Sequence, residues 1–345
     1  MVVKFKIIII IYINMIQLKY IIFFILFFIL SYFYNKIKKE ESKNTNEHYF
    51  KMIDKYLLTP ESLGKNNKPC LWIHINNENS IISNVNSRKW LDFYSRNTKN
   101  LNQPYQLITI KTIIDYNKND FNICMIDNSS FKKIIPNWTF DIDKMSNPIK
   151  NHIRNIALSK VLNIYGGIII PSSFICYQNL KPLWNNIQNN NKFTVSEMIN
   201  KSFNESFIQD TLPSNILMGS TPNNNILNDF IKFQEITISN NQSSEFEFNG
   251  ILGKWLLKNL NNNNDIELID GKLIGIKDEN NKVVTIDKLM SNENINFNCN
   301  KYGIYIPWDE LLTRVNYQWF SYLTVEEVLN SNNNLGKLIL LANQI

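Results

Sequence analysis

The sequence has little with which to bind a metal. It contains three histidines and four cysteines in 345 residues. The cysteines, Cys70, Cys124, Cys176 and Cys299, do not have the short paired spacings of zinc ligands. Three of them lie in apolar, strand-like runs, where cysteine behaves as a small buried hydrophobic residue. We therefore expect no zinc site and no resident cofactor.

The chain after residue 43 has almost no excess of either charge. The formal net charge of the whole chain is +6, but residues 1–43 hold seven lysines and two glutamates, a net charge of +5. The difference, 6 − 5, leaves +1 for the remaining residues. A nearly neutral domain has no general attraction for a phosphate backbone, so nucleic acid is excluded as an expected partner. The N-terminal lysines are suited to anionic lipid headgroups.

The longest apolar run lies near the N-terminus. Residues 7–34 are almost entirely Ile, Leu, Phe, Tyr and Met. A membrane-spanning helix needs about 20 such residues, and the run lacks the small-residue cleavage site of a signal peptide. A buried core helix is the alternative, but no polar face interrupts the run.

We therefore predict three segments, with a transmembrane anchor at 1–34, a polar stalk at 35–66 and one globular domain at 67–345. The protein is expected to cross a membrane once, with the lipid bilayer as a partner. Lysines flank the apolar run on both sides. The orientation therefore stays open, with a weak preference for a cytoplasmic domain.

The globular part alternates strand-like and helical patterns. Apolar runs at 70–75, 121–126 and 168–170 predict strands. A helix is expected at 104–116, beginning at Pro104, and a second at 147–165, capped by Asn147, with Pro148 in its first turn and Gly166-Gly167 at its end. This order predicts an α/β fold, with a mostly parallel sheet that carries helices on both faces.

The remaining elements follow from the same patterns. Strands are expected at 174–177, 193–198 and 216–219, and helices at 180–187, 226–236 and 250–259. Residues 265–287 alternate strand-like pieces with turns. Thr324 and Glu327 have the spacing of a capping box.

Residues 154–174, RNIALSKVLNIYGGIIIPSSF, carry a family resemblance. They resemble a segment of the glycosyltransferase family with a DxD sugar-binding motif, which includes yeast-type mannosyltransferases and bacterial capsule transferases. In that family a helix with Ser-Asp-x-x-Arg ends in Tyr-Gly-Gly, and a buried strand then delivers Asp-x-Asp. The resemblance implies a GT-A fold, a Rossmann-like sheet, and a nucleotide-sugar donor held through Mn²⁺ or Mg²⁺ by the two aspartates.

The aspartates themselves are missing from this chain. When the two patterns are aligned on Tyr165-Gly166-Gly167, Asp-x-Asp falls on Pro171, Ser172 and Ser173, and Ser-Asp-x-x-Arg falls on residues 154–158. Serine hydroxyls can hydrogen-bond a phosphate but cannot neutralise it or hold a divalent cation. The resemblance therefore implies the scaffold without its metal site, and no metal ligand is assigned.

Five residues are candidates for substrate binding, while the catalytic residues stay unknown. Arg154 lies one helical turn before the family's arginine and could partly replace it, and Ser172 and Ser173 could bind a phosphate. Asp309 and Thr313 share one face of a predicted helix, and Arg314 could clamp a phosphate. The alternative for Asp309 and Arg314 is a helix-start residue and a salt-bridge partner.

Three further groups are candidates, each with an alternative interpretation. Asp141 and Asp143 form a literal DxD, which is either a displaced metal site or a solvated pair near a helix start. His74 ends a strand, where ligands gather in such sheets, although a structural histidine is the commoner case. Arg88 and Trp90 could stack on a sugar or base, or pack as a core residue beside a surface charge.

A second resemblance covers roughly residues 70–330. The stretches at 87–90, 101–105, 131–138 and 306–320 resemble uncharacterised membrane-anchored proteins of large DNA viruses, which implies a host or virion membrane. The favoured function is a glycosyltransferase-like protein with a non-catalytic binding or structural role. The alternatives are an active, metal-independent glycosyltransferase with a nucleotide-sugar donor, and an unrelated α/β membrane protein. Expected ligands are a nucleotide sugar or a glycan.

Overall fold

The computed structural model describes residues 23, 25–34, 36–37, 55–56, 68–75, 103–200, 210–240, 245–262 and 265–344. The chain divides into two units, Met1–His48 and Tyr49–Ile345. In the first unit the described residues are helical, and their apolar side chains are exposed. No helix among the described residues is long and apolar enough to cross a membrane. Most of the predicted anchor and stalk, together with Arg88 and Trp90, lies outside the described residues.

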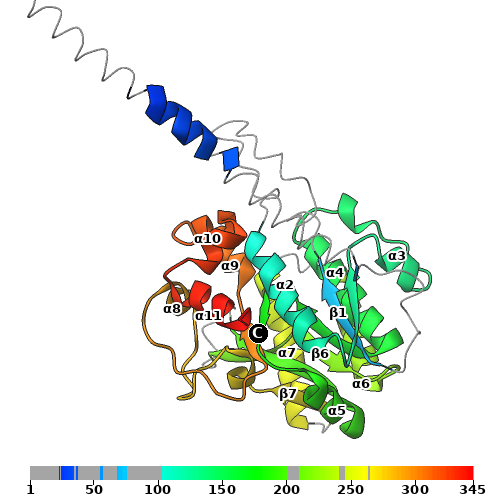
Figure 1. Ribbon diagram of the computed structural model, residues 1–345. Coiled ribbons are helices and arrows are strands. Elements are labelled where there is room, and N and C mark those ends of the chain that lie inside the picture. The colour runs from blue at the N-terminus through cyan, green and yellow to red at the C-terminus, as the bar shows by residue number, and fades with distance from the viewer. Residues whose placement is uncertain are drawn as a thin grey trace, which may run out of the picture. The chain divides into compact units, whose positions relative to one another are not determined.

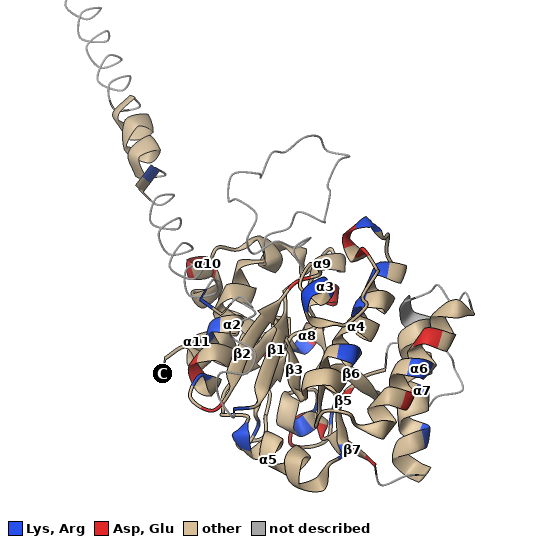
Figure 2. Ribbon diagram, turned by 90° about the vertical axis from the view of Figure 1, so that its right-hand side faces the viewer, with Lys and Arg blue, Asp and Glu red and all other residues tan. Residues whose placement is uncertain are grey.

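A six-stranded sheet organises the second unit (Figures 1 and 2). Its order is β2-β1-β3-β6-β5-β7. The strands are β1 (Cys70–His74), β2 (Asn122–Ile126), β3 (Gly167–Pro171), β5 (Phe193–Ile199), β6 (Thr211–Ser220) and β7 (Ile266–Ile269). Strand β1 pairs in parallel with β2 and β3, and β5 pairs in parallel with β7. Strand β6 runs antiparallel to β3 and to β5, so the predicted, mostly parallel α/β sheet is confirmed with one reversed strand.

Strand β3 lies at the centre of the sheet, between β1 and β6. Its residues Ile168, Ile169 and Ile170 are at most 3% exposed. A run of three isoleucines suits this place, because a central strand covered by helices has two apolar faces. The prediction of a fully buried central strand at 168–170 is confirmed.

Helices cover both faces of the sheet, as predicted. One apolar core contains residues of α2 (Pro104–Asn117), α5 (Lys181–Asn190), α8 (Ile286–Met290), α9 (Trp308–Thr313), α10 (Val325–Leu329) and α11 (Asn334–Ala342). The other contains residues of α3 (Phe131–Ile134), α4 (Ile149–Tyr165), α6 (Asn225–Ser239) and α7 (Glu245–Asn262). Neighbouring strand residues divide between these cores, as with Trp72 and Ile73, because successive side chains point to opposite faces.

The start of helix α4 differs from the prediction. Helix α4 begins at Ile149 with Pro148 as its N-cap residue and without a side-chain cap, so Asn147 does not cap it. A proline at that place cannot accept a capping bond, and the first turn is closed by the backbone instead. The capping box at Thr324 and Glu327 is confirmed.

The C-terminal part adds a small second sheet. Strand β4 (Phe174–Cys176) pairs antiparallel with β8 (Gly303–Tyr305). The sequence patterns missed β8, which is three residues long and has no alternation of its own. Short 3₁₀ segments complete the unit at η3 (Ile142–Lys144), η4 (Gly271–Ile274) and η5 (Gln318–Tyr322). The pairing of β4 with β8 brings residue 306 to the turn that follows β3.

Candidate functional site

The carboxyl ends of β1, β2, β3, β5 and β7 lie along one edge of the sheet, because these five strands run in the same direction. In open α/β sheets, ligands bind in the crevice outside this edge. We refer to it as the carboxyl edge. It carries three polar groups, which are described in turn.

The first group lies on the α4 side, and we call it the His74 cluster. Its members are His74, Asn128, Asp143, Asn151 and Arg154. The Asn128 side-chain oxygen accepts from Arg154 Nε at 3.0 Å and lies 3.2 Å from His74 Nε2, and its Nδ2 donates to Asp143 at 2.7 Å. Arg154 Nη1 also donates to Asn151 at 2.8 Å. One asparagine therefore joins the ends of β1 and β2 to α4 and η3.

The His74 ring is held neutral in this cluster. Burial, and after it the charge of the nearby Arg154 guanidinium, lower its pKa to about 3. Because Asn128 turns its oxygen toward both Arg154 and His74, His74 donates from Nε2 as the neutral tautomer. The ring also stacks on Phe131 at a centroid distance of 5.7 Å. A buried, neutral histidine can orient a neighbouring side chain by hydrogen bonding, but it carries no positive charge near neutral pH.

The second group lies on the α2 side, around the positions of the missing aspartates. Ser173 is fully buried, and its hydroxyl donates to the backbone oxygen of Ile306 at 2.9 Å. The Ser172 hydroxyl donates to Gln106 at 3.2 Å, and the Ser172 backbone oxygen accepts from Thr109 at 2.6 Å. Both serines therefore fasten the turn between β3 and β4 to its neighbours. Pro171 lies in register with His74 at the end of β3.

A buried network continues from Ser172 along the start of α2. Tyr105 Oη and Gln106 Nε2 both donate to the side-chain oxygen of Gln103, each at 2.9 Å. The Tyr105 ring packs against Phe320 of η5. Burial raises the pKa of Tyr305 well above its ordinary value, and the Asp309 and Glu310 carboxylates raise it further. Asp309 thus lies near Tyr305 and Tyr105.

Arg314 is engaged in ion pairs. Its Nη1 lies 3.0 Å from Asp287 and its Nη2 lies 2.7 Å from Glu310. Asp287 also accepts from Tyr317 Oη at 2.6 Å, and this hydrogen bond holds the pKa of Asp287 below its usual value, together with the Arg314 charge. The arginine therefore has the surroundings of a salt-bridge partner, the alternative that its position in the sequence left open.

The two aspartates of the literal DxD have separate partners. Asp141 lies 3.3 Å from Lys144 and 3.7 Å from Lys132, whereas Asp143 accepts from Asn128 in the His74 cluster. Within the part of the chain that the structure describes, no three histidine, cysteine, aspartate or glutamate side chains gather in the manner of a metal site. Among the candidates named from the sequence, Arg154 is linked to His74 and Asp143 through Asn128. Ser172 and Ser173 belong to the second group, in the turn between β3 and β4.

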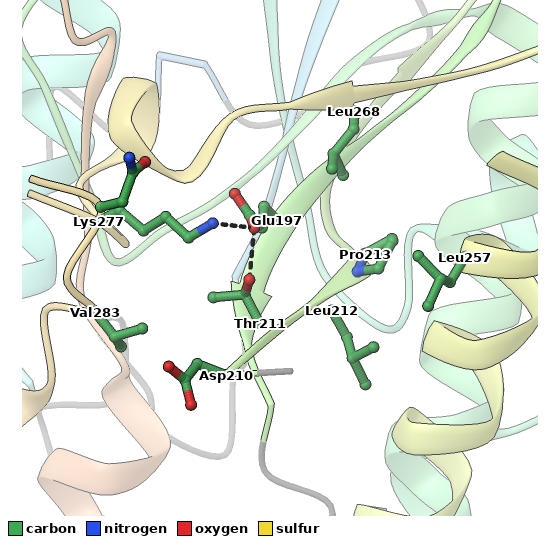
Figure 3. Close-up of a pocket in the computed structure, with 10 residues that line it drawn as sticks. Glu197, Asp210, Thr211, Leu212, Pro213, Leu257, Leu268, Lys277 and Val283 are labelled. Carbon is green, nitrogen blue, oxygen red and sulfur yellow. Dashed lines mark hydrogen bonds and ion pairs between the residues drawn. The ribbon is translucent and has the colours of Figure 1, made fainter. Parts of the chain in front are cut away.

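The third group borders a cavity of about 390 Å³ near the carboxyl ends of β5 and β7. Glu197 of β5 forms an ion pair with Lys277 and accepts from Thr211 Oγ1 (Figure 3). It also accepts from the Gly271 backbone N–H. Burial alone would raise the pKa of Glu197, but these hydrogen bonds lower it below its usual value. The aliphatic part of the lining consists of Leu212, Pro213, Leu257, Leu268 and Val283.

Sequence reasoning missed Asn128 and the pairing of Glu197 with Lys277. Asn128 is one asparagine in a chain that is rich in them, although its place directly after a buried strand was a usable signal. Glu197 and Lys277 are 80 positions apart, and the parallel pairing of β5 with β7 helps to bring their segments together.

The chain matches no model of a known protein family and no curated protein sequence. Solved structures with a similar chain course include GlyE of Streptococcus pneumoniae TIGR4, at 11% identity and a TM-score of 0.31, over 60% of this chain and 46% of GlyE. The chain thus spans less than half of that relative. The PaToxG glycosyltransferase matches at 13% identity and a TM-score of 0.35, over 87% of this chain and 96% of PaToxG. An active-site mutant of LgtC matches at 10% identity and a TM-score of 0.34, over 73% of this chain and 94% of LgtC.

Proposed function

We propose that this chain is a glycosyltransferase-like binding protein that takes a nucleotide sugar or a glycan at the carboxyl edge without a divalent metal. The proposal rests on how residues 171–173, which stand at the positions of the family's metal-binding aspartates, are bonded to the rest of the fold. The hydroxyl and backbone of Ser173 bond Ile306, and Ser172 bonds α2, so the turn that the family uses for its metal serves here to join elements. A non-catalytic role follows from the same loss of both carboxylates.

A second candidate, an active metal-independent transferase, is favoured by the Arg154 guanidinium. A diphosphate held without metal needs fixed positive charge, and arginine keeps its charge at any pH of interest. Arg154 is 8% exposed and lies at the carboxyl edge beside His74. Arg314 is the less suitable clamp, because Asp287 and Glu310 already balance its charge.

A thermal-shift titration with UDP- and GDP-sugars tests the absence of a metal site, which both candidates share. We expect no Mn²⁺-dependent stabilisation, because no carboxylate stands at position 171 or 173. A ligand at one hundred times its dissociation constant stabilises a protein by about 2.7 kcal/mol, which such an assay detects readily. A clear Mn²⁺-dependent shift would contradict the proposal and direct attention to Asp141 and Asp143.

Two variants refine the same experiment. A metal-independent shift that Arg154→Ala abolishes would favour the active transferase, since it would give Arg154 the role of holding the diphosphate without metal. Lys144→Ala is the matched control, because Lys144 is 84% exposed and its loss removes the same charge. A shift that survives both changes supports the binding protein.

We also propose that residues 1–34 anchor the chain in a host or virion membrane. This rests on the apolar run of the sequence and on the exposed apolar side chains of the described helical residues, such as Phe23, Phe28 and Tyr34, which are 67–69% exposed. Such a surface needs a covering of lipid or protein.

Deletion of residues 1–40 tests the anchor. The full-length chain is expected to stay in the membrane pellet after an alkaline wash, and the truncated chain is expected to be soluble and folded, because the apolar excess is removed with the deleted segment. Pelleting of both forms, measured by immunoblot of the two fractions, would show that the remaining domain binds the membrane by another surface.

A further inference from the structure

We propose that the cavity beside β5 and β7 binds a small aliphatic ammonium compound. The cavity lies on another part of the carboxyl edge than residues 171–173, and the inference does not depend on the proposed function. Its volume of about 390 Å³ falls within the range of about 300–1,000 Å³ that is common for small-molecule sites.

The aliphatic lining residues determine which hydrocarbon part, or body, of a ligand the cavity can hold. Leu257 of α7 and Leu268 of β7 are only half-buried, as is Val283, so each leaves apolar surface facing this space. In Figure 3, Lys277 and Leu257 lie on opposite sides, with Glu197, Thr211 and Leu212 between them. No aromatic ring is among the described lining residues, so the cavity offers no stacking platform for a sugar or a base. An aliphatic chain is the body that gains most from this wall, by removal of apolar surface from water.

The charged lining selects the head of the ligand. Glu197 and Lys277 neutralise each other, and the Thr211 hydroxyl and Gly271 N–H complete the hydrogen bonds of Glu197. Asp210 also lines the cavity, and no lysine or arginine of the described chain forms a salt bridge with it. Its backbone is fixed, because its carbonyl oxygen accepts from the Asn200 N–H at 2.8 Å. The described lining residues therefore carry a net charge of −1, which attracts a cationic head and repels an anionic one.

Three probes with one body and different heads test the proposal. These are n-hexylammonium, 1-hexanol and hexanoate, measured by saturation-transfer NMR with the full-length chain. We expect the ammonium to bind up to about fivefold more tightly than the alcohol, the size of a solvent-exposed charge pair, and hexanoate to bind most weakly. Equal or tighter binding of hexanoate would overturn the proposal, and so would the absence of saturable binding by any probe.

Variants assign the effect to this cavity. Asp210→Asn is expected to bring the ammonium to the affinity of the alcohol and to leave the alcohol unchanged. Asp229→Asn, which removes an exposed carboxylate from α6, is the matched control and should leave the ratio unchanged. Leu257→Trp fills the space and should weaken all three probes. If Asp210→Asn preserved the preference for the ammonium, the binding would lie elsewhere and the proposal would be wrong.

Discussion

Replacement of Gly167 by alanine is expected to destabilise the domain by at least about 4 kcal/mol, among the larger effects of single substitutions. Gly167 has φ +109°, a conformation that costs an L-residue roughly 1–3 kcal/mol. In addition, an added Cβ would lie 2.1 Å from the Cys70 backbone oxygen. Because that oxygen belongs to β1, the paired strands β1 and β3 would have to separate to make room.

Urea unfolding followed by tryptophan fluorescence measures this loss. Trp72 is a direct reporter, since it is fully buried and its Nε1 donates to the Gly166 oxygen at 2.9 Å. Gly253→Ala is the control. Its Cβ would lie 3.1 Å from the nearest backbone atom, and the helix-forming preference of alanine offsets this contact, so a change within about 1 kcal/mol is expected. Similar losses for both variants would show that strain at Gly167 is not the cause.

The Gly-Gly pair also shows how much of the fold the sequence contains. A helical pattern, two glycines and three isoleucines suffice to predict a helix that ends before a buried strand, and α4 and β3 have this form. Local chemistry decides these features, because glycine alone readily takes the positive φ that the turn requires. The reversed direction of β6 was not predictable in the same way, since it depends on its pairing with β3 and β5 and not on its own residues.

The sequence predicts only the position of the candidate site. The end of β3 follows from the buried strand and the resemblance, which together direct attention to residues 171–173. The partners of those residues come from distant segments. Ile306 reaches Ser173 through the pairing of β4 with β8, and Asn128 joins Arg154 to His74 across 26 and 54 positions. Side-chain contacts of this kind depend on tertiary packing, which leaves no local pattern in the sequence.

The domain is expected to lose stability steeply between about pH 6.5 and pH 4, because two histidines are held neutral. His152 of α4 is fully buried and stacks on Phe248 of α7 at a centroid distance of 3.9 Å. Neither of its ring nitrogens has a hydrogen-bond partner in the described part of the chain. Burial lowers its pKa to about 4, from an ordinary value of 6.5, and the pKa of His74 is lowered to about 3.

The sign follows from proton uptake. Above pH 6.5 both histidines are neutral in the folded and the unfolded chain, so neither affects the balance. As the pH falls below 6.5, the two histidines bind protons in the unfolded chain but not in the folded chain. The free energy of unfolding therefore decreases. His152 alone costs about 3 kcal/mol by pH 4 at 1.36 kcal/mol for each unit of pKa difference. Carboxylates with lowered pKa values, such as Glu197, add to the loss only near and below their own ordinary values of about 4.

His152→Leu isolates the contribution of His152. At pH 7 the variant should be at least as stable as the parent chain, because it removes two buried ring nitrogens that lack partners, and between pH 6.5 and 4 its loss should be smaller by about 3 kcal/mol. Ile153→Val, at the next position of α4, should lower stability by about 1 kcal/mol at every pH and leave the slope unchanged. Urea midpoints of the three chains, measured between pH 6.5 and 4, test this prediction. A parent chain with a flat profile, or a variant with the slope of the parent, would mean that the His152 ring takes up its proton without cost in the folded domain.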